Sequence, residues 1–254
     1  MILSHEHRFI FVKGMKVAGT SVEMALSTIC GPEDIITPIA PVDEKARLKM
    51  GGRCQNYSSD PEEERAYCTR VSNADLTQIP SIPRPQHQFY NHMPLHEIVS
   101  RCNRCVETYP VVAVERSPYS KVLSWMNMRI SFSKYRRGQS MVASMSEITA
   151  GLTTAIESRA VLAVRNIDRY RGRDGKLHAR LLRYDRLEED FKSLVRDLCP
   201  KCEYLPLPHA KKGLLADTFD PRKIFTPTQI ASINELFEEE FTTFGYEMIQ
   251  RTDA

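Results

Sequence analysis

Residues 8–23 of the chain read RFIFVKGMKVAGTSVE, and this segment sets the expected fold. Its apolar run at 9–12 is short and rich in strand formers. A small loop with two glycines and two lysines follows, and the apolar periodicity of residues 22–29 predicts a helix. The N–H groups and dipole of a helix N-terminus attract anions, and a nearby lysine adds positive charge. The segment therefore predicts a strand, a phosphate-sized loop and a helix.

The lysine of this loop is not where a Walker A loop has it. Gly14 and Gly19 have the GxxxxG spacing, but Thr20 stands at the position where that motif requires lysine. The lysine comes earlier, at Lys16. The sequence also has no obvious apolar strand ending in aspartate that would hold the magnesium of a nucleoside triphosphatase.

The segment KVAGTS, residues 16–21, instead resembles the 5′-phosphosulfate loop of sulfotransferases, usually written PKxAGTS. A Gly-Met pair replaces the residues before the lysine and leaves the lysine in register. The resemblance implies that the 5′-phosphate of the cofactor is bound by Lys16, Ala18, Gly19, Thr20 and Ser21.

A second phosphate site is expected after the apolar run PVVAVE, residues 110–115, which is typical of a buried parallel strand. Arg116-Ser117-Pro118, with Ser124 further on, resembles the 3′-phosphate signature RxPxxRxxSxY of the same family. Lys121 replaces its second arginine, and Trp125 lies one position before the place of its last aromatic residue. The resemblance implies that Arg116 and Ser124 hold the 3′-phosphate. Helical spacing predicts that Ser124 shares a face with Ser117 and Lys121.

Three of the seven histidines lie in residues 87–96. The segment His92-Met-Pro-Leu resembles the part of carbohydrate-type sulfotransferases that carries the catalytic base, so His92 is the expected base. His87 is the second candidate and His96, one turn inside a predicted helix, is the third. A later basic loop places Lys211 and Lys212 where relatives cover the cofactor, and either lysine could contact the 3′-phosphate.

The resemblance extends from Phe9 to Tyr246 and implies an α/β fold of the P-loop-NTPase-like type, three layers with a central parallel sheet flanked by helices. We expect one sulfotransferase domain over residues 1–254, with a variable insert at about 31–86. Residues 178–185 predict a strand, and 187–198 predict a helix. Residues 147–167 predict a helix broken near Gly151. A final helix is expected from Thr226-Pro227, with an apolar stripe that packs in the core; the stripe comprises Ile230, Ile233, Leu236, Phe237 and Phe241.

The expected reaction is transfer of a sulfuryl group from 3′-phosphoadenosine-5′-phosphosulfate to an acceptor hydroxyl. His92 acts as general base, and Lys16 compensates the charge on the leaving phosphate. No metal is required. A carbohydrate or glycolipid acceptor is expected by analogy with relatives. Two alternatives remain open: a P-loop kinase or nucleoside triphosphatase with a degenerate Walker A loop, and a catalytically inactive nucleotide-binding relative.

The composition of the chain is that of an ordinary globular protein. With 42% hydrophobic and 26% charged residues in 254, the chain fits one globular α/β domain. Its net charge of +3 does not argue for nucleic acid. The N-terminal sequence contains no long apolar stretch, so a cytoplasmic protein is expected, peripheral to a membrane if the acceptor is a glycolipid.

The seven cysteines include two CxxC pairs, Cys102/Cys105 and Cys199/Cys202. The gap between the pairs is much longer than in a compact zinc ribbon, so reduced or partly buried thiols are expected. Structural zinc, as in a zinc-ribbon nucleic-acid binder, and disulfides stay open as alternatives.

Overall fold

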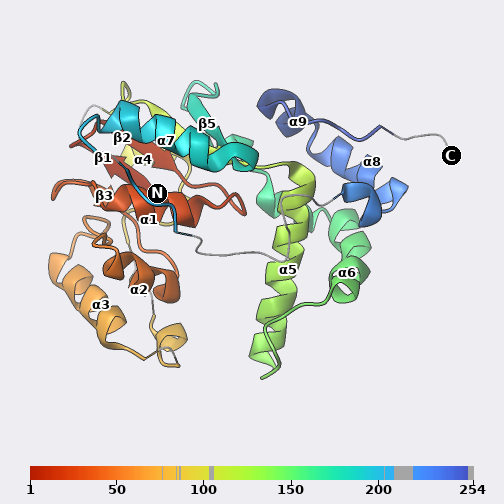
Figure 1. Cartoon of the computed structure of the whole chain (residues 1–254), viewed down its shortest axis with the longest axis horizontal. Coiled ribbons are helices and arrows are strands. Elements are labelled where there is room, and N and C mark those ends of the chain that lie inside the picture. The colour runs from red at the N-terminus through yellow and green to blue at the C-terminus, as the bar shows by residue number, and fades with distance from the viewer. Residues whose placement is uncertain are drawn as a thin grey trace. The chain divides into compact units, whose positions relative to one another are not determined.

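The structure is a computed structural model that describes residues 1–75, 77–83, 85, 87–102, 106–202, 204–208 and 220–250. The helices and strands of this part of the chain are β1 (Ile2–Ser4), β2 (Phe9–Val12), α1 (Gly19–Ser27), β3 (Ile35–Ile36), α2 (Pro41–Lys49), α3 (Pro61–Asn73), η1 (Ile79–Ser81), α4 (Leu95–Arg101), β4 (Val111–Glu115), α5 (Pro118–Arg136), α6 (Met145–Glu157), η2 (Ala160–Val164), η3 (Ile167–Arg169), β5 (Ala179–Arg183), η4 (Tyr184–Arg186), α7 (Leu187–Leu198), η5 (Pro221–Lys223), α8 (Pro227–Leu236) and α9 (Glu238–Phe244). Figure 1 labels the larger elements.

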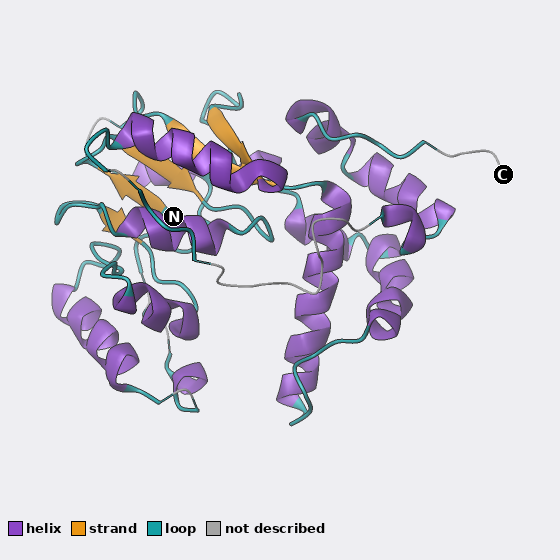
Figure 2. Cartoon of the chain, viewed as in Figure 1, coloured by secondary structure: helices purple, strands orange, loops and turns teal. Residues whose placement is uncertain are grey.

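The chain divides into two compact units. Unit 1 consists of Met1–Gly14, Ala18–Val114 and Asp168–Lys211, and unit 2 consists of Met15–Val17, Glu115–Ile167 and Lys212–Ala254. The strands lie in unit 1, except for the last residue of β4, whereas α5, α6, α8 and α9 belong to unit 2 (Figure 2).

The sheet of unit 1 has five strands in the order β3-β1-β2-β4-β5. β1 is antiparallel to both β2 and β3, whereas β2 and β4 are parallel, with Phe11 opposite Val112. β2, β3 and β4 therefore run in one direction and β1 runs in the other. The expected α/β class and the predicted strands at β2, β4 and β5 are confirmed.

The antiparallel strand β1 was not predicted, and for β1 the expectation of a parallel sheet is wrong. Only residues 5–8 connect β1 to β2. A connection this short can join antiparallel strands, whereas a parallel pair needs a crossover of a dozen residues or more. The crossover from β2 to β4 is long enough, and it contains α1 and the region from 31 to 86.

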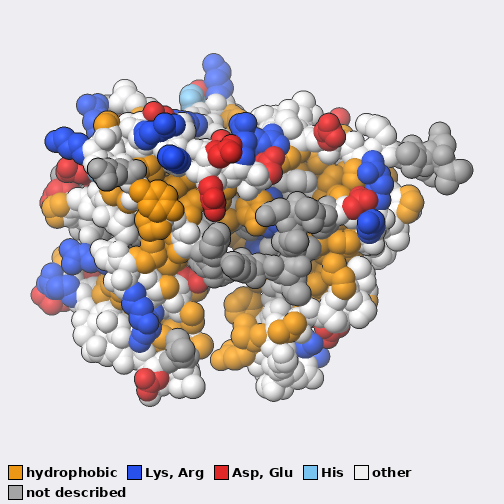
Figure 3. Space-filling view, in the orientation of Figure 1, with side chains coloured by type: hydrophobic (Ala, Val, Ile, Leu, Met, Phe, Trp, Pro, Cys, Tyr) orange, Lys and Arg blue, Asp and Glu red, His pale blue; other side chains and the backbone are white. Residues whose placement is uncertain are grey.

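Helices flank this sheet, and their apolar faces explain why they pack there. Every residue of β1, β2 and β4 is buried. α7 buries Phe191, Leu194 and Val195 and presents charged residues on its other face, where Figure 3 shows acidic and basic side chains. Burial of such a stripe contributes roughly 2 kcal/mol for each large apolar side chain.

In unit 2, α5 begins at Pro118, as predicted, and continues to Arg136. The predicted break near Gly151 is wrong, because α6 continues through it to Glu157. A Cβ atom at this glycine would lie 2.7 Å from the Cε atom of Met126 on α5, so the glycine leaves room for the end of that side chain. The capping box of Ser144 and Glu147 fixes the start of α6.

The C-terminal apolar stripe packs in the core of unit 2, as predicted. Ile233, Phe237 and Phe241 are at most 1% exposed. The predicted single helix is two, α8 and α9, with Phe237 at the junction. A capping box of Thr226 and Gln229 starts α8. No helix of the described residues is long and apolar enough to cross a membrane.

Candidate functional site

The loop after β2 has the backbone of an anion-binding turn. Lys16 and Ala18 are both left-handed, with φ of 62° and 63°. Ala18 directly precedes the right-handed residues of α1, and a left-handed residue next to a right-handed one turns successive N–H groups toward one point. Such a backbone costs on the order of 1 kcal/mol for each non-glycine residue, which makes it a reason to suspect function. Ser21 is a less suitable amide donor, because its N–H bonds to the Ala18 carbonyl at 3.0 Å.

The two lysines of the loop have different environments. Lys13 is buried, and its Nζ atom lies 2.7 Å from the Glu23 carboxylate on α1. A Cβ atom at Gly19 would lie 2.9 Å from the Lys13 Cγ atom, so glycine is required there for this lysine to pass. Lys16 is half-buried. Lys13 is therefore a structural residue that joins β2 to α1, and Lys16 is the lysine suited to a ligand.

His92 lies against this loop in unit 1. Its Nδ1 atom is 3.0 Å from the Lys13 carbonyl oxygen. Because a carbonyl can only accept, Nδ1 carries the proton and Nε2 carries the lone pair of the neutral ring. Burial, followed by the charge of Lys13, lowers the pKa of His92 from 6.5 to about 3. The ring is therefore neutral at neutral pH, in the tautomer whose Nε2 can accept a proton.

The other two candidate histidines are placed differently. The His87 ring packs edge-on against Tyr57, with 5.6 Å between ring centroids, and its Nδ1 atom contacts the Pro85 carbonyl. His96 is exposed on α4. For neither of them do the described contacts include one with the loop after β2.

Arg169 and Asn91, next to His92, were missed by the sequence analysis. The Arg169 Nη1 group donates to the His92 carbonyl at 2.9 Å. This bond holds a left-handed residue, because the φ of His92 is 64°. Among the described atoms, the Arg169 Nε and Asn91 Oδ1 atoms are buried and have no hydrogen-bond partner. Polar atoms of this kind next to a candidate base are suited to a polar ligand. No local motif marks an arginine 77 residues from the histidine that it contacts.

Arg116 and Ser124, which the resemblance assigns to the 3′-phosphate, both belong to unit 2. Arg116 follows β4 directly and is 9% exposed, and Ser124 is half-buried on α5. Lys121, which replaces the second arginine of the family signature, has a different environment. Its Nζ atom is fully buried between two carboxylates, 2.7 Å from Glu115 and 2.6 Å from Glu240. Lys121 is therefore part of the core of unit 2.

Asn166 connects the two predicted phosphate segments within unit 2. Its side chain accepts from the Met15 N–H at 2.7 Å and donates to the Met15 carbonyl at 3.1 Å. The same amide lies 3.4 Å from the Glu115 carboxylate. Met15 directly precedes Lys16, and Glu115 directly precedes Arg116. A single buried amide thus joins the residues before the two predicted phosphate ligands, although it is 151 residues from Met15.

The network behind Asn166 is buried and ionic. Glu240 accepts from the backbone N–H groups of Asn166 and Ile167, and from Lys121. Burial raises the pKa of Glu115, and the Lys121 ammonium opposes this shift. The Tyr246 hydroxyl donates to the Glu115 carbonyl at 2.9 Å. Glu115, the last residue of β4, is therefore held through both its carboxylate and its backbone carbonyl.

Two predicted site residues and one member of a CxxC pair fall outside the described part of the chain. Lys211 and Lys212 lie outside the described residues. Cys199 and Cys202 form a disulfide, so the expectation of reduced thiols is wrong for this pair. Cys105 of the other pair is not described. Among the described residues, no group of three or more His, Cys, Asp or Glu side chains is placed to hold a metal ion.

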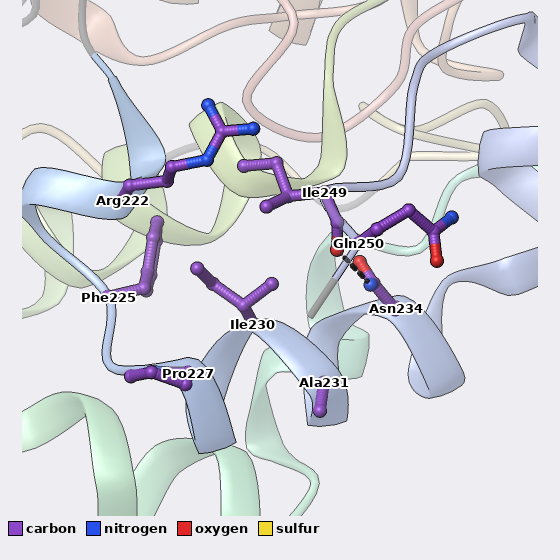
Figure 4. Close-up of a pocket in the computed structure, with 8 residues that line it drawn as sticks. All are labelled: Arg222, Phe225, Pro227, Ile230, Ala231, Asn234, Ile249 and Gln250. Atoms are coloured by element: carbon purple, nitrogen blue, oxygen red, sulfur yellow. Dashed lines mark hydrogen bonds between the residues drawn. The ribbon is translucent and has the colours of Figure 1, made fainter. Parts of the chain in front are cut away.

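A pocket of about 350 Å³ lies elsewhere in unit 2. Figure 4 shows the residues that line it, which include the apolar Phe225, Pro227, Ile230 and Ile249 and the polar Arg222, Asn234 and Gln250. The Asn234 amide donates to the Ile249 carbonyl at 3.0 Å and so holds the chain after α9. The described lining includes none of the predicted site residues.

Comparison of the chain with protein-family models, with curated proteins and with solved structures finds no match. The case for a function therefore depends on the residues and their geometry.

Proposed function

We propose that this chain is a sulfotransferase that moves a sulfuryl group from 3′-phosphoadenosine-5′-phosphosulfate to an acceptor hydroxyl, on a P-loop-like α/β fold. The observation that carries the proposal is the buried amide of Asn166, bonded to Met15 and close to Glu115. It links the segments before Lys16 and Arg116, which sequence resemblance assigns to opposite ends of one nucleotide. A ligand with a phosphate at both ends of an adenosine needs two anion sites.

The 5′ side of the nucleotide fits the loop after β2. Lys16 supplies the positive charge, since Lys13 is committed to Glu23. The amides of Gly19 and Thr20, at the start of the nine-residue helix α1, face the phosphate with support from the helix dipole. The Thr20 and Ser21 hydroxyls are half-buried and add donors.

The 3′ side fits the segment that follows β4. Because β2 and β4 are adjacent and parallel, the segments after them begin at the same end of the sheet, where open α/β sheets bind ligands. The Arg116 guanidinium has the planar fork that matches a phosphate, and Ser124 adds a hydroxyl. Lys121 does not bind the 3′-phosphate in this proposal, because its ammonium forms ion pairs with Glu115 and Glu240.

His92 removes the proton from the acceptor hydroxyl through Nε2, while the Lys13 carbonyl keeps the other ring nitrogen protonated. The cosubstrate supplies the electrophilic sulfuryl group. Lys16 stabilises the negative charge that develops on the leaving phosphate. A bound anion next to His92 would raise the pKa of the ring from about 3 toward its ordinary value and make it a better base.

The decisive experiment measures thermal unfolding with adenosine 3′,5′-bisphosphate in excess EDTA. Binding at 100 times Kd should stabilise the chain by about 2.7 kcal/mol without a metal. Adenosine 5′-monophosphate, which lacks the second phosphate, should stabilise it less. No shift with the bisphosphate would overturn the proposal, and a shift with ATP only when magnesium is present would favour the kinase or triphosphatase alternative.

The proposed acceptor is a carbohydrate or glycolipid hydroxyl, by analogy with the relatives that His92 and its neighbours resemble. A screen of acceptors with cosubstrate labelled in the sulfuryl group would identify it. If label reaches no acceptor although the bisphosphate binds, the chain is an inactive nucleotide-binding relative.

A further inference from the structure

Two cysteines of unit 1 that are 14 residues apart lie side by side. The Sγ atoms of Cys54 and Cys68 are 3.6 Å from each other. Cys54 is buried, and it directly precedes Gln55, whose backbone pairs with Ile36 of β3. Cys68 is half-buried on α3. The pair therefore stands where α3 meets the edge of the sheet.

We propose that Cys54 and Cys68 form a reversible disulfide. Cys68 is the cysteine that reacts first with an exchange partner from solvent. A disulfide has an S–S distance of about 2.05 Å, so the two sulfurs need to approach by roughly 1.5 Å. Small rotations of two side chains can supply such a movement. The proposal rests on this contact and is independent of the proposed function.

The two thiols have different roles because their environments differ. The hydrogen bond from Cys54 lowers the pKa of Cys68, and the charges of Arg47 and Arg53 act in the same direction. The same hydrogen bond, together with burial, raises the pKa of Cys54. Since a thiolate is the nucleophile in exchange and Cys68 is the more exposed sulfur, Cys68 reacts first with a molecule from solvent.

The oxidant is a low-molecular-weight disulfide of the glutathione class. The Cys68 thiolate attacks one of its sulfurs, forming a mixed disulfide and releasing one thiolate. The Cys54 sulfur then attacks Cys68, its proton passes to the released thiolate, and the second glutathione leaves as a thiolate. Two thiols of the protein are oxidised and one small disulfide is reduced to two thiols, so atoms and electrons balance.

The bond would fix a segment that supports the region of the candidate base. Tyr57 is three residues after Cys54, and its carbonyl accepts from the Phe89 N–H at 2.9 Å. Its ring contacts His87. α3 is held near the same segment by Glu64, which accepts from the N–H groups of Asn56 and Ser58. A covalent link between residues 54 and 68 adds to contacts already present.

The test maps disulfides in the full chain after equilibration in buffers of reduced and oxidised glutathione. Trypsin cleaves after Arg53, Arg65 and Arg70, so Cys54 and Cys68 fall on separate peptides, residues 54–65 and 66–70. After alkylation and digestion without reductant, the expected product is these two peptides joined, and dithiothreitol should separate them. Recovery of both peptides alkylated, under buffers in which Cys199 and Cys202 remain bonded, would overturn the proposal.

Single variants test the order of attack. Cys54→Ser should leave Cys68 carrying a glutathione adduct, whereas Cys68→Ser should leave Cys54 unmodified. The reverse pattern would overturn the assignment of Cys68. Cys30→Ser is the matched control, because burial raises the pKa of Cys30 and its thiol bonds to the Leu26 carbonyl, so this variant should keep the 54–68 bond. Mapping of the unmodified chain decides the main proposal even where a variant fails to fold.

Discussion

Lys16 is the side chain on which the proposed chemistry most depends. It stands in the left-handed part of the loop, and the other loop lysine is held by Glu23. Lys16 was predicted as the ligand lysine from the sequence. The ion pair of Lys13 with Glu23 explains why the loop carries a second lysine.

We expect Lys16→Ala to lower turnover by two orders of magnitude or more. A group that stabilises the charge of the leaving group lowers the activation free energy by about 3–4 kcal/mol in such sites. Circular dichroism and Tm should remain near those of the unmodified chain, because Lys16 is half-buried. Lys49→Ala, on the exposed end of α2, is the control and should leave turnover unchanged. Near-normal transfer in Lys16→Ala would remove Lys16 from the mechanism.

His92 should affect the pH dependence of the free energy of unfolding as well as activity. Its pKa is about 3 in the folded chain and about 6.5 when unfolded. Between these values the unfolded chain binds a proton that the folded chain does not, so stability falls as pH falls below 6.5. From pH 7 to pH 5 this group should cost up to about 2 kcal/mol of the free energy of unfolding.

The measurement is urea unfolding at several pH values for the unmodified chain and His92→Asn. Asparagine does not titrate and tolerates the left-handed backbone of this position. The variant should therefore lose less stability on acidification, whereas the exposed control His96→Asn should behave like the unmodified chain. Parallel pH curves for the unmodified chain and His92→Asn would contradict the assigned ring environment.

At the scale of elements, the strand-to-helix segments after β2 and β4 were predicted from the sequence. Asn166, which connects these two segments, was not. β2, the loop and α1 follow one another in sequence, as do β4, Pro118 and α5. Strand formers, a cap-like turn and a helix start are local signals. Asn166 comes after η2 and carries no such signal, although its amide bonds both backbone groups of Met15.

We expect Asn166→Ala to reduce the free energy of unfolding by about 1–3 kcal/mol, because partly buried backbone groups of Met15 lose their partner. Affinity for adenosine 3′,5′-bisphosphate, measured by calorimetry, should also fall. The matched control is Gln229→Ala, which removes another buried amide of unit 2, bonded to Thr153 at 3.0 Å. An equal change in affinity in both variants would mean that Asn166 acts through stability alone.

At the scale of the whole molecule, the buried triad of Lys121, Glu115 and Glu240 joins the last residue of β4 to α5 and α9 within unit 2. Two carboxylates beside one ammonium form a network in which each member depends on the others. Removal of one partner from a buried ion pair typically costs about 3–5 kcal/mol.

Lys121→Met should therefore lower the free energy of unfolding by about 3–5 kcal/mol, measured by urea denaturation. A double change, Lys121→Met with Glu240→Gln, should recover part of this loss because it neutralises one of the stranded carboxylates. A Lys121→Met variant of ordinary stability that no longer binds the bisphosphate would instead restore Lys121 to the 3′-phosphate site.

The sequence alone determined the elements whose signals are contiguous. Strands β2, β4 and β5, the start of α5 at Pro118, the helix α7 and the apolar stripe of α8 and α9 could all be predicted from runs of neighbouring residues. The short strands β1 and β3 and the continuation of α6 through Gly151 could not. Two or three residues carry too little periodicity to predict a strand, and a glycine inside a helix has the same local signal as one that ends a helix.

The tertiary structure decided which of several similar residues occupies which environment. It committed Lys13 and Lys121 to buried carboxylates, and it placed His92, rather than His87 or His96, against the loop after β2. It also brought Asn166 to Met15 and Arg169 to His92. These contacts join residues far apart in the chain, and a lysine or histidine has the same local pattern whether it is buried in an ion pair or faces a ligand. Burial and long-range pairing, which set the charge and tautomer of each group, arise only when the chain has folded.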